Sequence, residues 1–314
     1  DLSEYVQDTS KAPKLKWIIE GGQSGFSRLG QTWAAPKLIK MKINGASRNL
    51  FVIAGGYDPE QDKAIKPTID TTGNAIYLVD ANTGQLVWTA SPDGSAQLTL
   101  SNMQNGFVAS VSPIDVDSDG HVETIFAADI GGHLWRFDFD KDNKGTGVHD
   151  KFSTGGMIAK VSGTGVGDDE LAANNRRFSA GVSVALAMDS GGKRYYTLAI
   201  GSGFRPEPLS ETVQNRFYVF KDTEVGKVPS SYSKIQESEL YDASANIAQT
   251  GTTEEKSLAI KAMASASGWF IKLRTGEKIF DNPTTYDGNF LFTTFRKSGS
   301  ALTCGADTGT GAFY

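Results

Sequence analysis

A three-segment pattern that repeats along the chain is the feature that most restricts its fold. Each copy has a segment that ends near small residues, an aliphatic segment that runs into glycine, and an aromatic segment that runs into aspartate. The copies are Thr32–Pro36, Leu50–Gly56 and Ala75–Asp80; Val111–Ile114, Ile125–Asp129 and Gly132–Asp138; and Ser183–Leu186, Tyr196–Gly203 and Asn215–Asp222. Every segment has the length of a β-strand, and such self-similarity is typical of repeated supersecondary units.

The residue pattern within each copy predicts how the strands pack. The middle segment, such as Leu50–Gly56, is continuously apolar, as expected when neighbouring sheets cover both faces of a strand. The third segment alternates between polar and apolar residues and then meets a turn. Blades of a β-propeller satisfy both patterns, because radial packing protects the strand edges that an open sheet would expose. The repeat therefore predicts an all-β propeller.

The length sets the number of blades. At roughly 45 residues per blade, a chain of 314 residues allows up to about seven blades. Insertions between blades would reduce this number to five or six complete blades and an unfinished one.

The composition supports an all-β protein and excludes several classes of partner. The 35 glycines and the 10% of aromatic residues are typical of a protein with many turns. The formal net charge is -5 and the sequence contains no cluster of Lys and Arg, which argues against nucleic acid as a partner. No apolar stretch approaches the roughly 18 residues that are needed to cross a bilayer.

Two parts of the chain depart from the repeat. Residues 1–16 are polar and without a clear period, so they are interpreted as a lead-in segment before a single propeller domain over residues 17–314. A region around residues 230–267 is richer in Ala, Glu, Lys and Leu and has apolar residues at helical spacing. We expect one or two helices there, over Ser238–Ala248 and Glu254–Ala266, as an insertion between blades.

The ends of the chain indicate a piece of a longer protein. The sequence starts at Asp1 without a methionine, and its single cysteine is Cys304. This thiol is either a buried structural group or one half of a disulfide whose partner lies outside the sequence, and its place in a glycine-rich tail favours the second interpretation.

One predicted hairpin has the ligand order of a calcium-binding loop. Its acidic residues and its glycine occupy positions one, three, five, six and nine of the loop: Asp115, Asp117, Asp119, Gly120 and Glu123. Converging carboxylates are unfavourable unless a hard cation neutralises them, and glycine takes the positive φ of the sharp turn without steric cost. The backbone carbonyl of His121 is predicted as a further ligand, because a hard oxygen site disfavours imidazole nitrogen. The sequence therefore predicts a Ca²⁺ site.

The loop departs from an EF-hand in two ways. Position twelve is Phe126 instead of a bidentate glutamate, and both flanks have the pattern of strands instead of helices. We therefore expect a calcium loop within a β-hairpin, closed by Glu123. The alternative is a solvated acidic turn, since Asp and Gly are common turn residues. Two other acidic segments, residues 58–62 and 138–143, lack the full ligand order and are predicted to be exposed turns.

Short hairpins with a Thr-Gly turn form a second motif. Asp80–Trp88 has an aspartate, a Thr-Gly pair in which Gly84 would take a positive φ, and a closing tryptophan. A related sequence recurs over Leu273–Phe280. The motif resembles the blades of quinoprotein-type propellers, in which the tryptophan docks between blades. The large aromatic side chains are accordingly assigned to the core by default: Tyr57, Trp17, Trp33, Trp88, Trp135 and Trp269.

Three stretches together resemble the C-terminal domain of the PilC/PilY family of type IV pilus biogenesis factors and tip-associated adhesins. They are Arg28–Pro36, the loop Asp115–Glu123, and Asp129–Asp138, within a similarity that extends over residues 17–220. The resemblance implies a modified quinoprotein-like β-propeller, into which the helices expected around residues 230–267 would be inserted. It also implies export to the outer membrane, the cell surface or the pilus tip, with pilins or minor pilins and host or abiotic surfaces as partners.

The resemblance also implies a role for the loop. The calcium ligands of the family would correspond to Asp115, Asp117, Asp119 and the carbonyl of His121, with Glu123 in place of the usual aspartate. The calcium state would regulate pilus extension versus retraction and thereby support twitching motility and surface attachment. Some members of the family carry an Arg-Gly-Asp tripeptide for integrin binding, and this sequence has none.

Two other functions fit a propeller that binds calcium. A quinoprotein-type dehydrogenase would hold calcium and a quinone cofactor at its centre, but the sequence has no vicinal cysteine pair, and its calcium loop is continuous. We therefore predict that the chain is not an enzyme. A generic extracellular binding propeller would use the same calcium only to staple a hairpin. The affinity for calcium distinguishes this structural role from a regulatory one, because a regulatory site must lose its ion within the physiological range of calcium concentrations.

Overall fold

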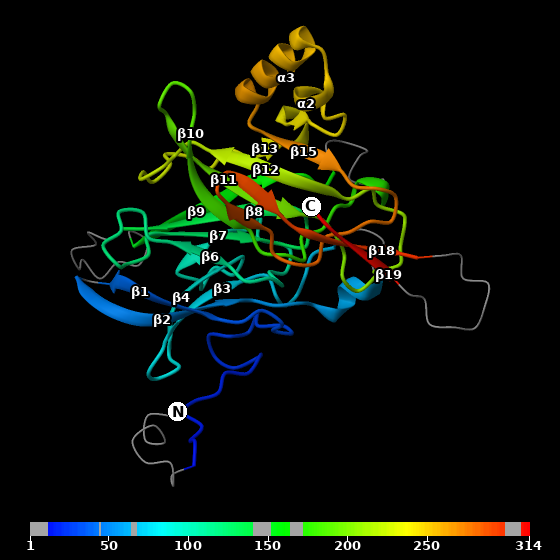
Figure 1. Ribbon diagram of the computed structural model, residues 1–314. Coiled ribbons are helices and arrows are strands. Elements are labelled where there is room, and N and C mark those ends of the chain that lie inside the picture. The colour runs from blue at the N-terminus through cyan, green and yellow to red at the C-terminus, as the bar shows by residue number, and fades with distance from the viewer. Residues whose placement is uncertain (1–11, 44, 64–67, 141–151, 164–171, 299–308) are drawn as a thin grey trace, which may run out of the picture.

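The computed structural model describes residues 12–43, 45–63, 68–140, 152–163, 172–298 and 309–314, which form mainly β-strands. Three five-stranded sheets lie one above another (Figure 1) and are called the first, second and third blades. The two-stranded sheets β16-β17 and β18-β19 accompany them. Cys304 and most of the predicted lead-in segment lie outside the described residues.

The first blade has the strand order β1-β2-β3-β4-β5. Strands β1 to β4 pair antiparallel, and the short β5 adds to β4 in parallel. The bounds are β1 (Lys37–Ile43), β2 (Ala46–Ala54), β3 (Ile76–Asp80), β4 (Leu86–Ser91) and β5 (Leu98–Thr99). Gly84, in the turn between β3 and β4, has the expected positive φ of 72°.

The second and third blades repeat this plan, with orders β13-β9-β8-β7-β6 and β10-β11-β12-β15-β14. In each, four antiparallel strands carry one short parallel strand at the edge. The second blade contains β6 (Ser112–Ile114), β7 (Thr124–Ala128), β8 (His133–Phe139), β9 (Ser153–Lys160) and β13 (Ile235–Gln236). The third contains β10 (Ser183–Met188), β11 (Arg194–Gly201), β12 (Arg216–Asp222), β14 (Tyr241–Asp242) and β15 (Gly268–Lys272).

The two remaining sheets are hairpins near the C-terminal end. Their strands are β16 (Thr284–Tyr286), β17 (Asn289–Leu291), β18 (Thr293–Lys297) and β19 (Gly309–Phe313). A turn with positive φ at Asp287 and Gly288 joins β16 to β17.

The expected all-β propeller fold is confirmed, but the blades take up less of the chain than predicted. Eight of the nine repeat segments contribute a strand; Thr32–Pro36 instead precedes β1. The described residues form three complete blades and two hairpin sheets, not about seven blades. Long connections and the helical insertion use the remaining length, and the third blade takes its last antiparallel strand, β15, from beyond the insertion.

The helices within the described residues are few and short. They are η1 (Pro59–Lys63), η4 (Ala172–Asn174), η5 (Glu237–Glu239), α2 (Ile247–Thr250) and α3 (Thr253–Ser265). A capping box begins α3, because the Thr252 hydroxyl accepts the Glu255 N–H while the Glu255 carboxylate accepts the Thr252 N–H. None of the described helices is long and apolar enough to cross a membrane.

The insertion only partly follows its helical prediction. The expected helix over Glu254–Ala266 is α3, but Ser238–Ala248 forms a helix only at its two ends and contributes β14 between them. Pairing of β14 with β15 of the third blade overrides the local helix propensity of this segment.

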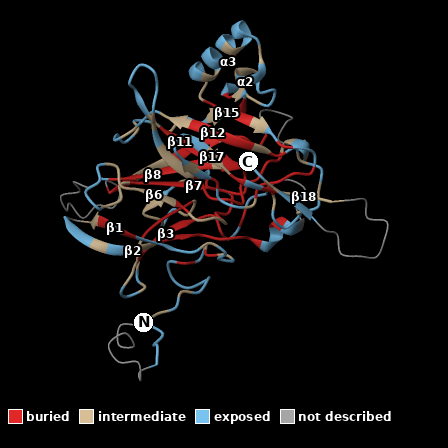
Figure 2. Ribbon diagram, viewed as in Figure 1, coloured by how far each residue is buried: buried red, intermediate tan, exposed pale blue. Residues whose placement is uncertain are grey.

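The core lies between the blades, where buried residues follow the strands (Figure 2). Successive side chains of a strand point to opposite faces of its sheet. Thus Ile125 and Ala127 of β7 join a cluster shared with the first blade, whereas Phe126 and Ala128 join a cluster shared with the third. A strand between two blades therefore needs apolar residues at every position, which explains its unbroken apolar run.

Trp88 connects the first blade to the second, as the hairpin motif predicts. The indole is fully buried and makes edge contacts with Phe137 and Phe139 of β8. Its N–H donates to the hydroxyl of Ser153, in β9, at 2.8 Å. The interblade contact thus satisfies the only polar group of the indole.

A buried ion-pair network connects the second blade to the third. Arg136 of β8 is 1% exposed and pairs with Asp138 at 2.8 Å and with Asp222 of β12 at 2.7 Å. The Asp138 carboxylate also accepts hydrogen bonds from the hydroxyls of Thr124 and Tyr232, both at 2.8 Å. The prediction of a solvated turn from residue 138 is therefore wrong for Asp138, which is part of the core.

Replacing the central cation of this network should strongly destabilise the protein. Arg136→Ala leaves Asp138 and Asp222 in the interior without their partner, and removing one member of a buried pair costs about 3–5 kcal/mol. The free energy of unfolding from denaturant titration would measure this loss. Arg48→Ala is the control, because the ion pair of Arg48 with Asp80 is at the surface and should contribute less than about 1 kcal/mol. Equal losses in the two variants would contradict the prediction.

Candidate metal centre

The predicted calcium loop is the hairpin connection between β6 and β7. The strands pair until Ile114 and Thr124, and the N–H of Glu123 donates to the Ile114 carbonyl at 3.1 Å. Positive φ angles at Ser118 (63°) and Gly120 (87°) turn the backbone between them. The flanks are therefore strands, as the sequence predicts, and only the glycine adopts this conformation without steric cost.

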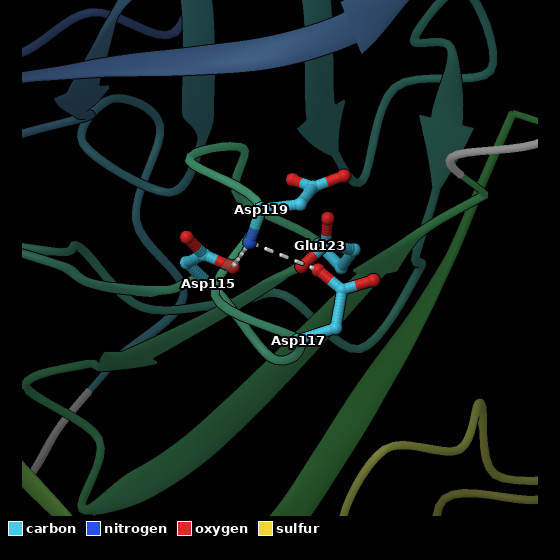
Figure 3. A group of neighbouring side chains, drawn as sticks. All are labelled: Asp115, Asp117, Asp119 and Glu123. Carbon is cyan, nitrogen blue, oxygen red and sulfur yellow. Dashed lines mark hydrogen bonds between the residues drawn. The ribbon is translucent and has the colours of Figure 1, made fainter.

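Four carboxylates of this loop converge (Figure 3). Asp115, Asp117, Asp119 and Glu123 each offer one oxygen, and these oxygens all lie within 4.8 Å of one another. The N–H of Asp119 lies 3.2 Å from Asp115 Oδ1 and 3.3 Å from Asp117 Oδ1, and the N–H of Gly120 donates to Asp115 Oδ2 at 2.8 Å. Backbone donors therefore hold the aspartates on the concave side of the turn.

The carboxylate of Glu123 has one buried oxygen that lacks a hydrogen-bond partner in the part of the chain that the structure describes. Its Oε2 accepts the N–H of Val116 at 2.9 Å, whereas its Oε1 is buried and has no hydrogen-bond partner among the described residues. Burial raises the pKa of this carboxyl, and the negative charges of Asp117, Asp115 and Asp119 raise it further against the Val116 hydrogen bond. A buried acceptor without a partner is unfavourable, and a cation among these oxygens would satisfy it. The donor set thus fits a hard cation.

The imidazole of His121 does not belong to this cluster of oxygens. Its Nδ1 lies 2.9 Å from Asp119 Oδ1, and its Nε2 lies 3.0 Å from the hydroxyl of Ser47, in β2. The ring therefore contacts the first blade. Ligation by the backbone carbonyl of His121 remains a prediction.

The first blade also places the ammonium group of a lysine beside the loop. Lys42 of β1 donates to Asp119 Oδ2 at 2.6 Å, and the N–H of Val122 donates to the carbonyl of Lys40 at 2.8 Å. The hydrogen bond from Lys42, followed by that from His121, lowers the pKa of Asp119. The sequence gives no sign of these contacts, because Lys42 and Ser47 lie far from the loop along the chain.

The other acidic segment that was expected to be an exposed turn, residues 58–62, lies mostly in the short 3₁₀ helix η1, where Glu60 and Asp62 are exposed as predicted. Asp58 is 4% exposed and Gln61 is fully buried. The Asp58 carboxylate accepts the backbone N–H groups of Thr71 at 2.9 Å and Thr72 at 3.2 Å, so it ties η1 to a distant loop. The Asp58 carboxylate therefore holds the backbone of this loop in place.

Comparisons with known proteins give relatives in sequence and in fold. No family model matches the chain. The chain is 25% identical over 177 residues to the type IV pilus biogenesis factor PilY1 homolog of Xylella fastidiosa, a match over 56% of this chain and 11% of that protein. It is 25% identical over 134 residues to the type IV pilus biogenesis factor PilY1 of Pseudomonas aeruginosa, over 43% of this chain and 10% of that protein. The match therefore spans about a tenth of the length of each relative.

A solved structure agrees with these relatives. The crystal structure of the Pseudomonas aeruginosa PilY1 C-terminal domain matches 90% of this chain and 60% of that one, with a TM-score of 0.60 and 18% identity. The predicted resemblance to the C-terminal domain of the PilC/PilY family is therefore confirmed, in sequence by two PilY1 relatives and in fold by the PilY1 C-terminal domain.

Proposed function

We propose that this chain is a calcium-binding β-propeller domain of a type IV pilus biogenesis factor. The observation that carries the metal site is the convergence of four carboxylates around the unpartnered buried oxygen of Glu123. Asp115, Asp117, Asp119 and Glu123 would hold the ion through carboxylate oxygens, together with the carbonyl of His121. Ca²⁺ fits better than Mg²⁺, because Ca²⁺ accepts irregular arrangements of six to eight oxygens, whereas Mg²⁺ demands a near-ideal octahedron.

The position of the site supports a regulatory role. The loop contacts β1 and β2 of the first blade through Lys42, Lys40 and Ser47. A bound ion would neutralise the repulsion within the loop and fix its surface at this junction between blades. We propose that this surface controls pilus extension versus retraction and thereby supports twitching motility and surface attachment.

The names of the relatives support the cellular setting of this proposal. The protein would be exported and held at the outer membrane, the cell surface or the pilus tip. Its partners would be pilins or minor pilins, and host or abiotic surfaces. The role is binding rather than catalysis. The contact between the loop and β1 also favours a second function, in which the ion is a permanent staple between two blades of a generic binding propeller.

Calcium should stabilise the chain specifically. At about a hundred times its dissociation constant, a ligand adds roughly 2.7 kcal/mol to the free energy of unfolding, which raises the Tm by a few degrees. We expect this shift with Ca²⁺, a smaller one with chelator plus excess Mg²⁺, and none in Asp117→Ala. Asp189→Ala is the control, because Asp189 is an exposed turn carboxylate outside the loop, and should keep the full shift.

The calcium dependence of the Tm also separates regulation from stapling. A midpoint within a physiological range of calcium would support regulation, whereas retention of the ion against dilute chelator would support the staple. The absence of a shift in the unsubstituted chain would contradict both and leave the loop as a solvated acidic turn.

Lys42→Ala should increase the affinity for calcium. The ammonium group of Lys42 donates a hydrogen bond to Asp119 Oδ2 and repels a divalent ion. Its removal therefore makes this oxygen available as a ligand and removes one positive charge from beside the site. Because water screens this interaction, we expect Kd to fall about two- to tenfold, as measured by calorimetry. Lys37→Ala removes the same charge from the opposite face of β1 and should leave Kd unchanged. Weaker binding in Lys42→Ala would show that Lys42 instead positions Asp119.

The regulatory half of the proposal has its own test in cells. Asp117→Asn, introduced into the full-length protein, removes one ligand charge while keeping the size of the side chain. We expect the calcium dependence of pilus retraction and of twitching motility to be lost, and Asp189→Asn to retain it. If calcium still controls pilus retraction in Asp117→Asn, regulation through this site is ruled out, but the proposal that the loop binds calcium is not affected.

A further inference from the structure

A pocket of about 560 Å³ lies where segments of all three blades and the chain after them meet. It shares no residue with the carboxylate loop. Tyr57 follows β2, Ile130 follows β7, and Phe204 follows β11, so the pocket lies where the second antiparallel strand of each blade ends. Its volume is within the range of small-ligand sites in proteins.

Aromatic side chains from distant segments form much of the wall. Trp33, Tyr57, Phe204 and Phe280 all line the pocket. Trp33 is 76% exposed, so the prediction that this tryptophan packs in the core is wrong. Tyr57 is buried and its hydroxyl donates to Asp62 at 2.5 Å. The pocket thus combines an indole face open to solvent with a fixed ring at its base.

Polar groups at the rim are held in place and keep hydrogen-bonding capacity. The Asn282 side-chain oxygen accepts the N–H of Gly181 at 2.6 Å, while no described residue accepts a hydrogen bond from its Nδ2. Asp281 Oδ1 accepts the N–H of Asn282 at 2.8 Å, and Arg205 donates through one nitrogen to the carbonyl of Phe280. Each of these side chains has a further donor or acceptor for a ligand.

Charges of both signs lie around the pocket. Asp62 and Asp281 contribute two carboxylates, and Arg205 contributes a guanidinium at the wall. Behind Phe204, the guanidinium of Arg177 lies 3.9 Å from the ring centroid and donates to the buried Gln61 at 3.0 Å. A charged ligand of either sign would therefore meet charges of its own sign, and a neutral ligand would not.

We propose that this pocket binds a neutral saccharide. Every sugar hydroxyl both donates and accepts, which matches a rim that offers the amide of Asn282, the carboxylate of Asp281 and the guanidinium of Arg205. The apolar C–H face of a sugar ring would pack on the exposed indole of Trp33, since an aromatic face is apolar and slightly negative. The hydrogen bonds that already fix the rim and base reduce the entropy lost on binding.

The test is a titration of the full chain with lactose, maltotriose and the trimer of N-acetylglucosamine, followed by calorimetry and tryptophan fluorescence. We expect at least one to bind with a Kd between about 0.1 and 10 mM. Trp33→Ala should weaken binding at least about tenfold without lowering the Tm, because the indole is exposed, and Asp281→Asn should also weaken it. Trp269→Phe is the control, since Trp269 packs on Phe217 and Phe290 away from the pocket.

Several results would overturn this proposal. One is the absence of binding by all three saccharides at about 10 mM. Another is binding that is equal in Trp33→Ala and the unsubstituted chain. A third is binding of a neutral tetrapeptide, but of no saccharide, which would assign the pocket to protein partners. A calcium titration of Trp33→Ala keeps the two proposals apart, because loss of saccharide binding should leave the metal site unaffected.

Discussion

Burial of apolar side chains between successive sheets is the interaction on which the rest of this structure depends. The second blade is covered on both faces, so alternate residues of β7 serve different interfaces. Neither interface is apolar throughout: Trp88 brings an N–H that Ser153 satisfies, and Arg136 brings a charge that Asp138 and Asp222 satisfy. These polar contacts are directional, so they fix the register of one blade on the next, which general apolar attraction does not.

The surroundings of the candidate metal centre depend on that register. The carboxylates come from one short loop, but Lys42 and Ser47 reach that loop only because the first blade is fixed against the second. The electrostatics of the loop therefore has a local and a distant component. Local repulsion among four carboxylates favours a cation, and the distant ammonium of Lys42 partly replaces it at Asp119. In the proposed calcium site, the competition between the two would set the affinity for the ion.

The difference between local and distant contacts also explains which features the sequence can predict. Strand segments and the carboxylate loop follow from short-range patterns, because a period of two and a ligand spacing within nine residues are both visible locally. Apart from the tryptophan of the Thr-Gly hairpin, long-range contacts have no such signature. The contact of Lys42 with the loop, the burial of Asp138 and the exposure of Trp33 therefore could not be predicted. Residues 238–248 show the reverse case, in which a local helical pattern yields to pairing with β15.

The metal centre and the pocket lie at opposite ends of β7. Glu123 comes directly before this strand and Ile130 follows soon after it. Coupling between two sites requires an element with two discrete arrangements that both sites bias. All five residues of β7 are buried, and four of them pack against the first or third blade, which disfavours a second arrangement of this strand. An effect of calcium should therefore remain at the loop and at its contacts with β1 and β2, and a ligand in the pocket should not sense it. Regulation by this domain would then act through the surface at the junction of the first two blades.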